Sequence, residues 1–192
     1  MTNMPSIRLA AAQSVSVAGD IASNVLVHTR FIASAHRAGV DLLVFPELSL
    51  SGYELPLLRE CAVRPDDSRL APIRDMARQT QMTVVVGAPL ACEIGALPSI
   101  AAFTFFPDGT TSIYCKQHLH SSEEKYAVAG EKTSRRHDLL GESYSLAICA
   151  DTSHEPPAAD AAATGASLYL AGVLVSEGGY PAASSNLQRY AA

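Results

Sequence analysis

The chain has 192 residues, which suffices for one domain whose hydrophobic core needs neither metal ions nor disulfides. Hydrophobic residues make up 48% and charged residues 17%, with a net charge of −5, so the composition excludes intrinsic disorder and argues against nucleic-acid binding, which needs a basic surface. The sequence contains no apolar run long enough to span a bilayer and no secretory pattern, so we expect a cytoplasmic protein that binds neither membrane nor nucleic acid.

The first half of the chain alternates predicted strands and helices. Asp20 is a typical N-cap residue and Gly39 a typical helix stop, and the apolar run 41–45 ends at Pro46. The predicted elements, in order, are a strand over residues 7–17, a helix between Asp20 and Gly39, a strand over 41–45, a helix with the apolar stripe Leu70, Ile73 and Ala77, and a strand over 82–88.

The second half contains one predicted hairpin and then a further alternation. The turn Pro107-Asp108-Gly109 separates two strand-forming runs. The predicted elements are strands over 100–106, 110–115 and 143–148, a short helix over 156–163, a strand over 167–175, and the first turns of a helix over 186–192. With no linker or repeat, this order predicts a single α/β domain over residues 1–192, with helices packed on sheet faces.

Three residues whose side chains could take part in catalysis each follow a predicted strand. Glu47 follows the run 41–45, where partial burial raises the pKa of a carboxyl group and makes it a usable base. Lys116 follows a strand of the hairpin, where a buried ammonium can stabilise an oxyanion. Cys149 ends the run 143–148 before a turn, which is the arrangement of a nucleophile elbow.

Each residue alone also has an ordinary structural interpretation. Glu47 could be an exposed loop carboxylate, Lys116 a solvated lysine at a strand end, and Cys149 a buried and unreactive thiol. Their positions along the chain do not by themselves decide between these alternatives.

Taken together, three local motifs resemble the carbon–nitrogen hydrolase (nitrilase/amidase) superfamily. They are Phe45-Pro46-Glu47, then Lys116-x-x-Leu119 followed by Glu123 and Gly130, and then Ile148-Cys149-x-Asp151. The order Glu, Lys, Cys is the order of that family, and the resemblance covers essentially the whole chain.

The resemblance implies a fold and a mechanism. The fold would be a four-layer α-β-β-α sandwich whose subunits pair into a homodimer or a higher homo-oligomer. Cys149 would attack an amide or nitrile carbon, Glu47 would be the general base, and Lys116 with the backbone N–H of Ala150 would stabilise the tetrahedral intermediate. Glu123 would position the lysine and the substrate. A thioester acyl-enzyme would form and be hydrolysed, without a metal or an organic cofactor.

The sequence also departs from the family pattern. Ala150 stands where an aromatic residue is common, Ser153-His154 follows it, and 127–129 lacks the usual aromatic residue and proline. These changes affect the expected pocket lining, and we expect a small amide substrate rather than a nitrile. Further strands follow in the family after the last predicted helix, so we expect residues 1–192 to be a C-terminally truncated domain. The competing hypothesis is a non-catalytic member that serves as a structural or interaction module.

Other chemistries are less well supported. The four cysteines (Cys61, Cys92, Cys115 and Cys149) show no CxxC spacing, and His118-x-His120 lacks further ligands at metal-binding spacing. His154 lies on the same turn as Cys149, which is a poor position for a Cys–His pair. The glycine loop 176–180 lacks a phosphate-binding motif, and by the resemblance it lies near the mouth of the pocket.

Overall fold

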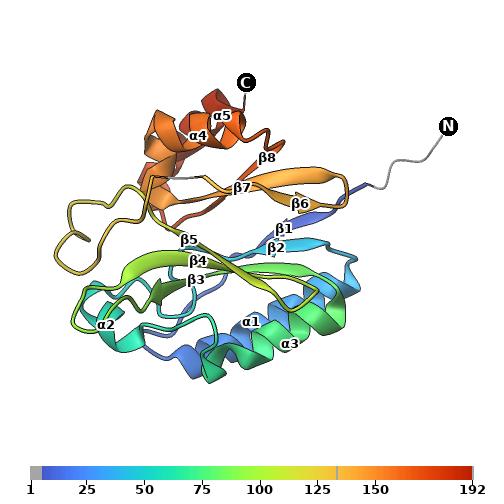
Figure 1. The fold of residues 1–192 in the computed structure, drawn as a ribbon, viewed down its shortest axis with the longest axis horizontal. Helices are drawn as coiled ribbons and strands as arrows, with labels where there is room; N and C mark the ends of the chain where they lie inside the picture. Colours follow the sequence, from blue (N-terminus) through green and yellow to red (C-terminus); the bar gives the residue numbers. More distant parts are fainter. Residues whose placement is uncertain (1–5, 133, 192) are drawn as a thin grey trace.

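Two β-sheets lie face to face between two layers of helices. The computed structural model describes residues 6–132 and 134–191. Helices α1 (Ile21–Arg37) and α3 (Ala71–Thr80) cover the outer face of one sheet, and α4 (Glu155–Ala163) and α5 (Tyr180–Tyr190) cover the other (Figure 1). This arrangement confirms the predicted four-layer α-β-β-α sandwich.

The larger sheet combines parallel and antiparallel strands. Its order is β1 (Leu9–Ala11), β2 (Leu42–Val44), β3 (Thr83–Leu90), β4 (Ser99–Phe105) and β5 (Thr111–Cys115). The first three strands are parallel, with α1 and α3 as crossovers, and β3, β4 and β5 form an antiparallel meander. The β4–β5 pair is the hairpin that the sequence predicts. Short turns of helix, including α2 (Leu58–Cys61), lie between β2 and α3.

The smaller sheet carries the second half of the chain. Strand β7 (Glu142–Ile148) lies at its centre, antiparallel to β6 (His137–Leu139) and parallel to β8 (Leu168–Gly172). Strands β1 and β8 are edge strands among the described residues, and a groove of about 430 Å³ runs between them and β2.

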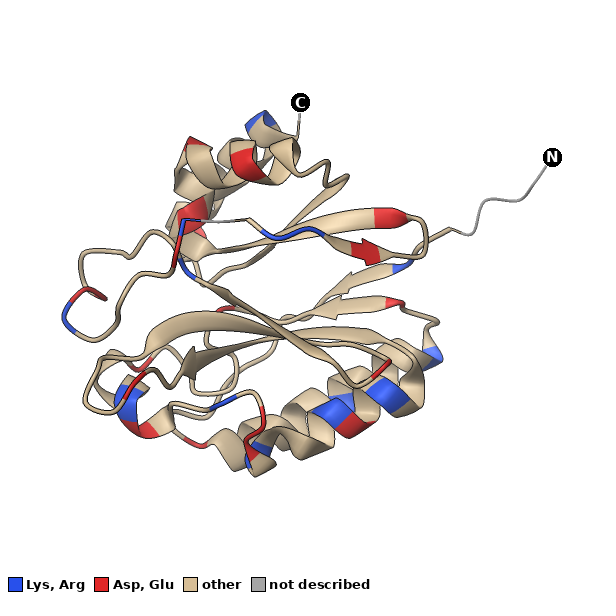
Figure 2. Cartoon of the chain, viewed as in Figure 1, with Lys and Arg blue, Asp and Glu red and all other residues tan. Residues whose placement is uncertain are grey.

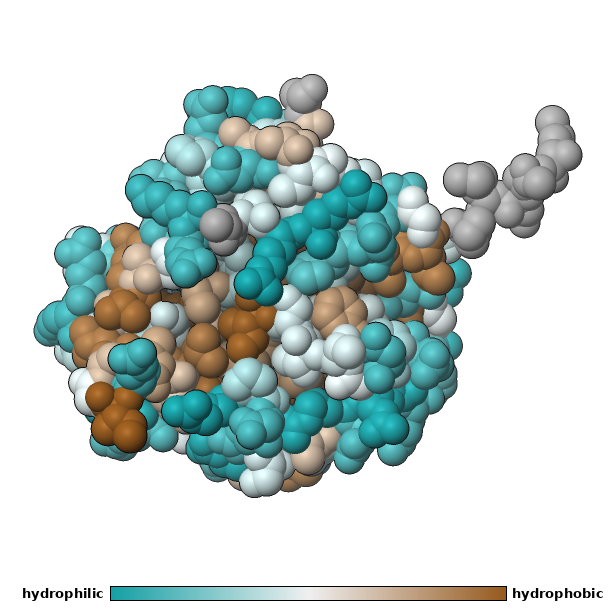
Figure 3. Space-filling model, viewed as in Figure 1, coloured by the Kyte–Doolittle hydropathy of each residue, from teal (hydrophilic) through white to brown (hydrophobic). Residues whose placement is uncertain are grey.

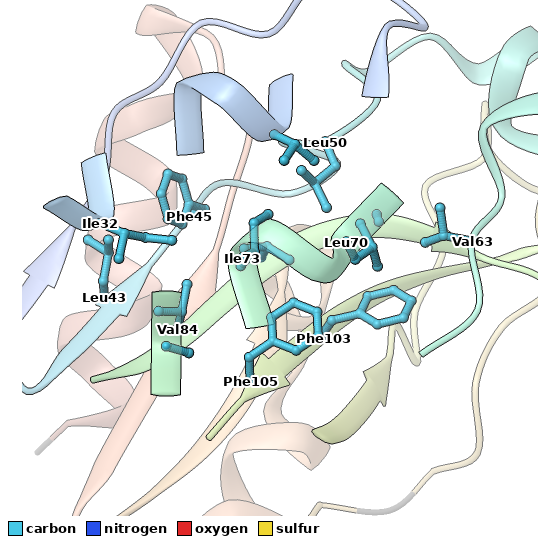
Figure 4. Close-up of a cluster of buried hydrophobic side chains, with 14 of the residues drawn as sticks. Ile32, Leu43, Phe45, Leu50, Val63, Leu70, Ile73, Val84, Phe103 and Phe105 are labelled. Carbon is cyan, nitrogen blue, oxygen red and sulfur yellow. The ribbon is translucent and has the colours of Figure 1, made fainter. Parts of the chain in front are cut away.

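Two hydrophobic clusters hold the layers together. One fills the space between α1, α3 and the larger sheet, and includes the side chains labelled in Figure 4 (Ile32, Leu43, Phe45, Leu50, Val63, Leu70, Ile73, Val84, Phe103 and Phe105). The other lies between the two sheets and joins residues such as Val85 and Ile100 to Leu146 and Ile148. Removal of apolar surface from water is the largest favourable contribution to the free energy of folding. The central strands β3 and β4 are accordingly buried along nearly their whole length.

Charged side chains lie mainly on the outer helices and loops. Figure 2 shows them along the outside of α1 and α3, while the central strands carry few. The surface that covers these two helices is correspondingly hydrophilic, and apolar surface is visible nearer the middle of the same view (Figure 3). None of the described helices is long and apolar enough to cross a membrane.

Helix α1 illustrates how local sequence sets an element. The side chain of Asp20 accepts a hydrogen bond from the N–H of Ser23 at 3.0 Å, which caps the helix, and Gly39 adopts φ +68° just after the helix ends. The apolar residues at helical spacing face the core, as the sequence predicts.

Several predicted boundaries were wrong. The first strand spans three residues rather than 7–17, because the following segment leaves the sheet and the N–H of Val17 bonds to the side chain of Asn24 at 2.7 Å. The last strand ends at Gly172, and α5 begins at Tyr180 rather than Asn186. Residue 192, at the end of the predicted last helix, lies outside the described residues.

Strand β6 was not predicted. Its sequence, His137-Asp138-Leu139, has no apolar alternation, and it forms because it pairs with β7 across a tight turn. Both turn residues, Leu140 and Gly141, have positive φ, as a two-residue hairpin turn requires.

Candidate active site

The three strand ends singled out from the sequence converge beside one another. The Lys116 ammonium, directly after β5, donates to Glu47 Oε1 at 2.6 Å and to Glu123 Oε1 at 2.7 Å. All three of these side chains are fully buried. Cys149, directly after β7, interacts electrostatically with both Glu47 and Lys116. The structure therefore brings Glu47, Lys116, Glu123 and Cys149 together.

Glu47 is held by close packing of its loop against β3. A Cβ added to Gly87 would lie 2.4 Å from the N atom of Leu48 and 2.5 Å from the carbonyl oxygen of Pro46, so only glycine fits there. The N–H of Leu50 donates to the carbonyl of Gly87 at 2.9 Å. The loop that carries the carboxylate is thus pinned to the neighbouring strand.

A chain of buried hydrogen bonds from α1 supports the same loop. The Nδ1 atom of His28 lies 2.7 Å from the carbonyl oxygen of Asn24, which can only accept, so Nδ1 carries the proton and Nε2 accepts from the Ser49 hydroxyl at 2.9 Å. Ser49 Oγ in turn accepts from the N–H of Gly87 at 3.2 Å. Burial lowers the pKa of His28 to about 4, which keeps the ring neutral.

Glu123 has a nearly complete set of hydrogen-bond partners. Besides Lys116, it accepts from the Tyr53 hydroxyl at 2.5 Å and from the N–H of His120 at 2.8 Å. The adjacent Glu124 is exposed. Because its charge is compensated by several donors, Glu123 is suited to fixing the position of the Lys116 ammonium.

Glu47 is less well satisfied. Its Oε1 accepts from Lys116, while no donor among the described residues meets Oε2 in full hydrogen-bond geometry, and the carboxylate interacts with the thiol of Cys149. Burial raises the pKa of this carboxyl group, and the positive charge of Lys116 opposes the increase. A buried carboxylate with one such oxygen is well suited to accept a proton.

Lys116 stays charged despite its burial. Burial by itself lowers the pKa of an amine, but the charges of Glu47 and Glu123 and their hydrogen bonds more than offset this, so that the pKa of Lys116 is raised. A backbone contact fixes its position, since the N–H of Gly130 donates to the Lys116 carbonyl at 2.8 Å. A Cβ on Gly130 would lie 2.5 Å from the Cβ of Cys115, so this approach also requires glycine.

Cys149 lies on a sharp turn and has a rare backbone conformation. Its φ is +42°, a region that non-glycine residues rarely adopt and that is typical of functional sites. The thiol donates to the carbonyl of Leu174, just beyond β8, at 3.5 Å. Burial and then the charge of Glu47 raise the pKa of Cys149 to about 11, so the resting thiol is neutral. Ala150 follows at the start of a short 3-10 turn.

Asp151 was part of a sequence motif but was not predicted to act in the site. Its buried carboxylate accepts from the N–H of His118 at 2.8 Å and of Gln117 at 3.1 Å on one oxygen. On the other it accepts from the Tyr114 hydroxyl at 2.9 Å and from the N–H of Ile148 at 3.1 Å. It therefore joins the segment after Lys116 to the segment before Cys149. A carboxylate two residues past a strand-end cysteine is the only sequence signal for this role.

The histidines near the site are engaged by protein groups. His118 stacks on His154 with ring centroids 4.1 Å apart, and its Nδ1 lies 3.2 Å from Asp151 Oδ1. His120 Nδ1 instead lies 2.9 Å from the hydroxyl of Ser122. The His118-x-His120 pair is thus divided between two separate interactions.

The comparisons with known proteins identify relatives that match most of the chain. Residues 8–192 match the family profile described as Carbon-nitrogen hydrolase. The chain is 26% identical over 186 residues to a glutamine-dependent NAD(+) synthetase from Mycobacterium leprae (strain TN); the match covers 84% of this chain but only 27% of that protein.

Solved structures of an amidase from Nesterenkonia show the same fold. A cysteine-to-serine variant of this nitrilase-superfamily amidase superposes with a TM-score of 0.81 at 26% identity, covering 91% of this chain and 69% of that one. A variant showing covalent addition of the acetamide moiety of fluoroacetamide at the active-site cysteine gives a TM-score of 0.82 at 26% identity, covering 94% and 70%. Sequence and fold agree, and this chain belongs to the carbon–nitrogen hydrolase family.

Proposed function

We propose that this protein hydrolyses small amides through a cysteine nucleophile, with Glu47, Lys116 and Cys149 as its catalytic triad. The observation that carries the proposal is the buried Glu47, whose Oε2 meets no described donor in full hydrogen-bond geometry, in a cluster whose other carboxylate, Glu123, is already satisfied. The two glutamates differ in hydrogen bonding, and that difference supports Glu47 as the base and Glu123 as the positioning residue.

The acylation step follows from these roles. Glu47 accepts the thiol proton as the sulfur of Cys149 bonds to the amide carbon, which avoids forming a free thiolate from a thiol whose pKa is about 11. The carbonyl oxygen becomes an oxyanion that the Lys116 ammonium and the backbone N–H of Ala150 stabilise. The carbon–nitrogen bond then breaks, and the nitrogen leaves as ammonia with the proton from Glu47.

The deacylation step uses the same groups. Glu47 takes a proton from water as the water oxygen attacks the thioester carbon. The second tetrahedral intermediate collapses to a carboxylic acid, and the proton returns to the sulfur of Cys149. All steps proceed with side chains and backbone of this chain.

Two similarities favour an amide over a nitrile. Mutants of the Nesterenkonia amidase form complexes with acrylamide and with butyramide. The Mycobacterium leprae relative is glutamine-dependent, and glutamine itself carries a primary amide. The small side chain of Ala150 beside the nucleophile is compatible with small acyl groups.

Ammonia release from butyramide, acrylamide, glutamine and an aliphatic nitrile tests the proposal. We expect turnover of an amide that Cys149→Ala abolishes and Glu47→Gln reduces by about a thousandfold or more. The matched control is Glu124→Gln, since Glu124 is exposed beside Glu123 and its loss should leave the rate unchanged. A well-folded wild-type chain without turnover of any of these compounds would favour the non-catalytic alternative.

A further inference from the structure

Two glycines from different sheets lie against the backbone that carries Glu47. Gly87 of β3 lies beside this backbone within the larger sheet. Gly172, the last residue of β8, approaches it from the smaller sheet. A Cβ at Gly172 would lie 3.0 Å from the carbonyl oxygen of Phe45 and 3.4 Å from the nitrogen of Glu47. The first of these distances is well below ordinary van der Waals contact, so the two sheets meet this closely because residue 172 has no side chain.

The same glycine lies next to the segment of the nucleophile. In the parallel register of β7 and β8, Gly172 pairs with Ile148, which directly precedes Cys149. Two residues further along the chain, the carbonyl of Leu174 accepts the hydrogen bond from the Cys149 thiol at 3.5 Å. The end of β8 therefore contacts the loop of Glu47 on one side and the segment of Cys149 on the other.

We propose that Gly172 is a positioning residue, whose missing side chain lets Glu47 and Cys149 approach to the separation that proton transfer requires. The inference rests on the proposed function, in which Glu47 accepts the thiol proton. Such a transfer needs donor and acceptor atoms about 2.6–3.2 Å apart. Glu47 follows β2 of the larger sheet and Cys149 follows β7 of the smaller sheet, which faces it (Figure 1). Their separation is therefore set by how closely the two sheets pack at this point.

A methyl group at position 172 would enlarge this separation whichever side moves. The loop of Glu47 resists displacement, because the N–H of Phe45 donates to the carbonyl of Val85 at 2.8 Å. If β8 moves instead, β7 and Cys149 move with it through their shared hydrogen bonds. The small cavity beside this contact holds about 10 Å³, roughly the space that one water molecule needs, so it cannot absorb the change.

A double-mutant cycle with butyramide as substrate tests the inference. A misplacement of about 1 Å can cost about a hundredfold in rate, so a shift of a few tenths of an ångström by Gly172→Ala should lower kcat by about fivefold. KM should stay within about twofold, because the groups that bind the carbonyl oxygen are unchanged. In the Glu47→Gln chain the same substitution should lower kcat by less than about twofold, because no base remains whose distance matters.

The matched control is Ala171→Ser, which also adds one heavy atom to β8. Side chains alternate between the two faces of a strand, and Leu168 and Leu170 pack between the sheets, so Ala171 faces the other way from position 172. This variant should keep kcat within about twofold in both backgrounds.

An equal loss of kcat in both backgrounds would overturn the inference, because Gly172 would then serve only the fold. Thermal unfolding shows whether Gly172→Ala is folded at the assay temperature, and sucrose, which favours the compact state, extends the assay to a less stable chain. A Gly172→Ala chain that stays unfolded in sucrose would overturn the inference as well. An unchanged kcat in Glu47→Gln would instead contradict the proposed function, and the inference would fall with it.

Discussion

Replacement of Asp151 by asparagine should weaken both the fold and the site. Asp151 is fully buried, and its two oxygens serve separate donor sets, Gln117 and His118 on one side and Tyr114 and Ile148 on the other. An asparagine can satisfy only one set, because its amide nitrogen would point its hydrogens at the donors of the other. Hydrogen bonds to a charged group contribute about 1.5–3 kcal/mol each, so the loss of two bonds costs about 3–6 kcal/mol.

That cost is a large fraction of the stability of a single domain, which is about 5–15 kcal/mol. Urea unfolding measures it directly, and the matched control is Asp160→Asn on the exposed side of α4, which should change the unfolding free energy by less than about 0.5 kcal/mol. Because the carboxylate joins the segments of Lys116 and Cys149, kcat for amide hydrolysis should also fall. A variant that loses less than about 1 kcal/mol and retains full activity would refute this reasoning.

Three further predictions follow from the fold. The pKa of His28 is about 4 in the folded chain against 6.5 in the unfolded chain, so the unfolded chain binds the proton first as the pH falls. About 3 kcal/mol of unfolding free energy, present in full above pH 6.5, should therefore be lost as the pH falls to about 4. A pH series of unfolding free energies in which wild type and His28→Asn change in parallel would contradict this. Gly87→Ala should destabilise the protein by about 3 kcal/mol and reduce amide turnover, because the new Cβ would collide with the loop of Glu47, whereas Gly178→Ala, which has open space, should have little effect on thermal unfolding. Assembly into a homodimer or a higher homo-oligomer stays a prediction, which a single monomeric species in sedimentation velocity at micromolar concentration would contradict.

The sequence predicted the features that depend on neighbouring residues. Helix α1 was predicted because its cap, its stop and its apolar stripe are local, and the hairpin β4–β5 because Pro107-Asp108-Gly109 is a local turn. The positions of Glu47, Lys116 and Cys149 at strand ends were equally visible. Their approach to one another depends on the sheet order, and only the family resemblance suggested it.

The features that the sequence missed depend on tertiary contacts. Strand β6 exists because β7 pairs with it, and the first strand is short because Asn24 draws the following segment toward α1. The requirement for glycine at positions 87 and 130 arises from backbones distant in sequence. The role of Asp151 likewise depends on two loops that the fold brings together, and the hydrophobic periodicity of the sequence cannot indicate such a contact.

The most direct test of the account is to trap the acyl-enzyme. Rapid acid quench of the wild-type chain with butyramide, followed by peptide mass mapping, should show a butyryl thioester on the peptide that contains Cys149 and on none of the peptides that contain the other three cysteines. The account predicts that this adduct disappears in Cys149→Ala and persists longer than in wild type when Glu47 is replaced by glutamine, because deacylation needs the same base. Amide hydrolysis that continues in Cys149→Ala, or an adduct on a different residue, would contradict the central claim that Cys149 is the nucleophile.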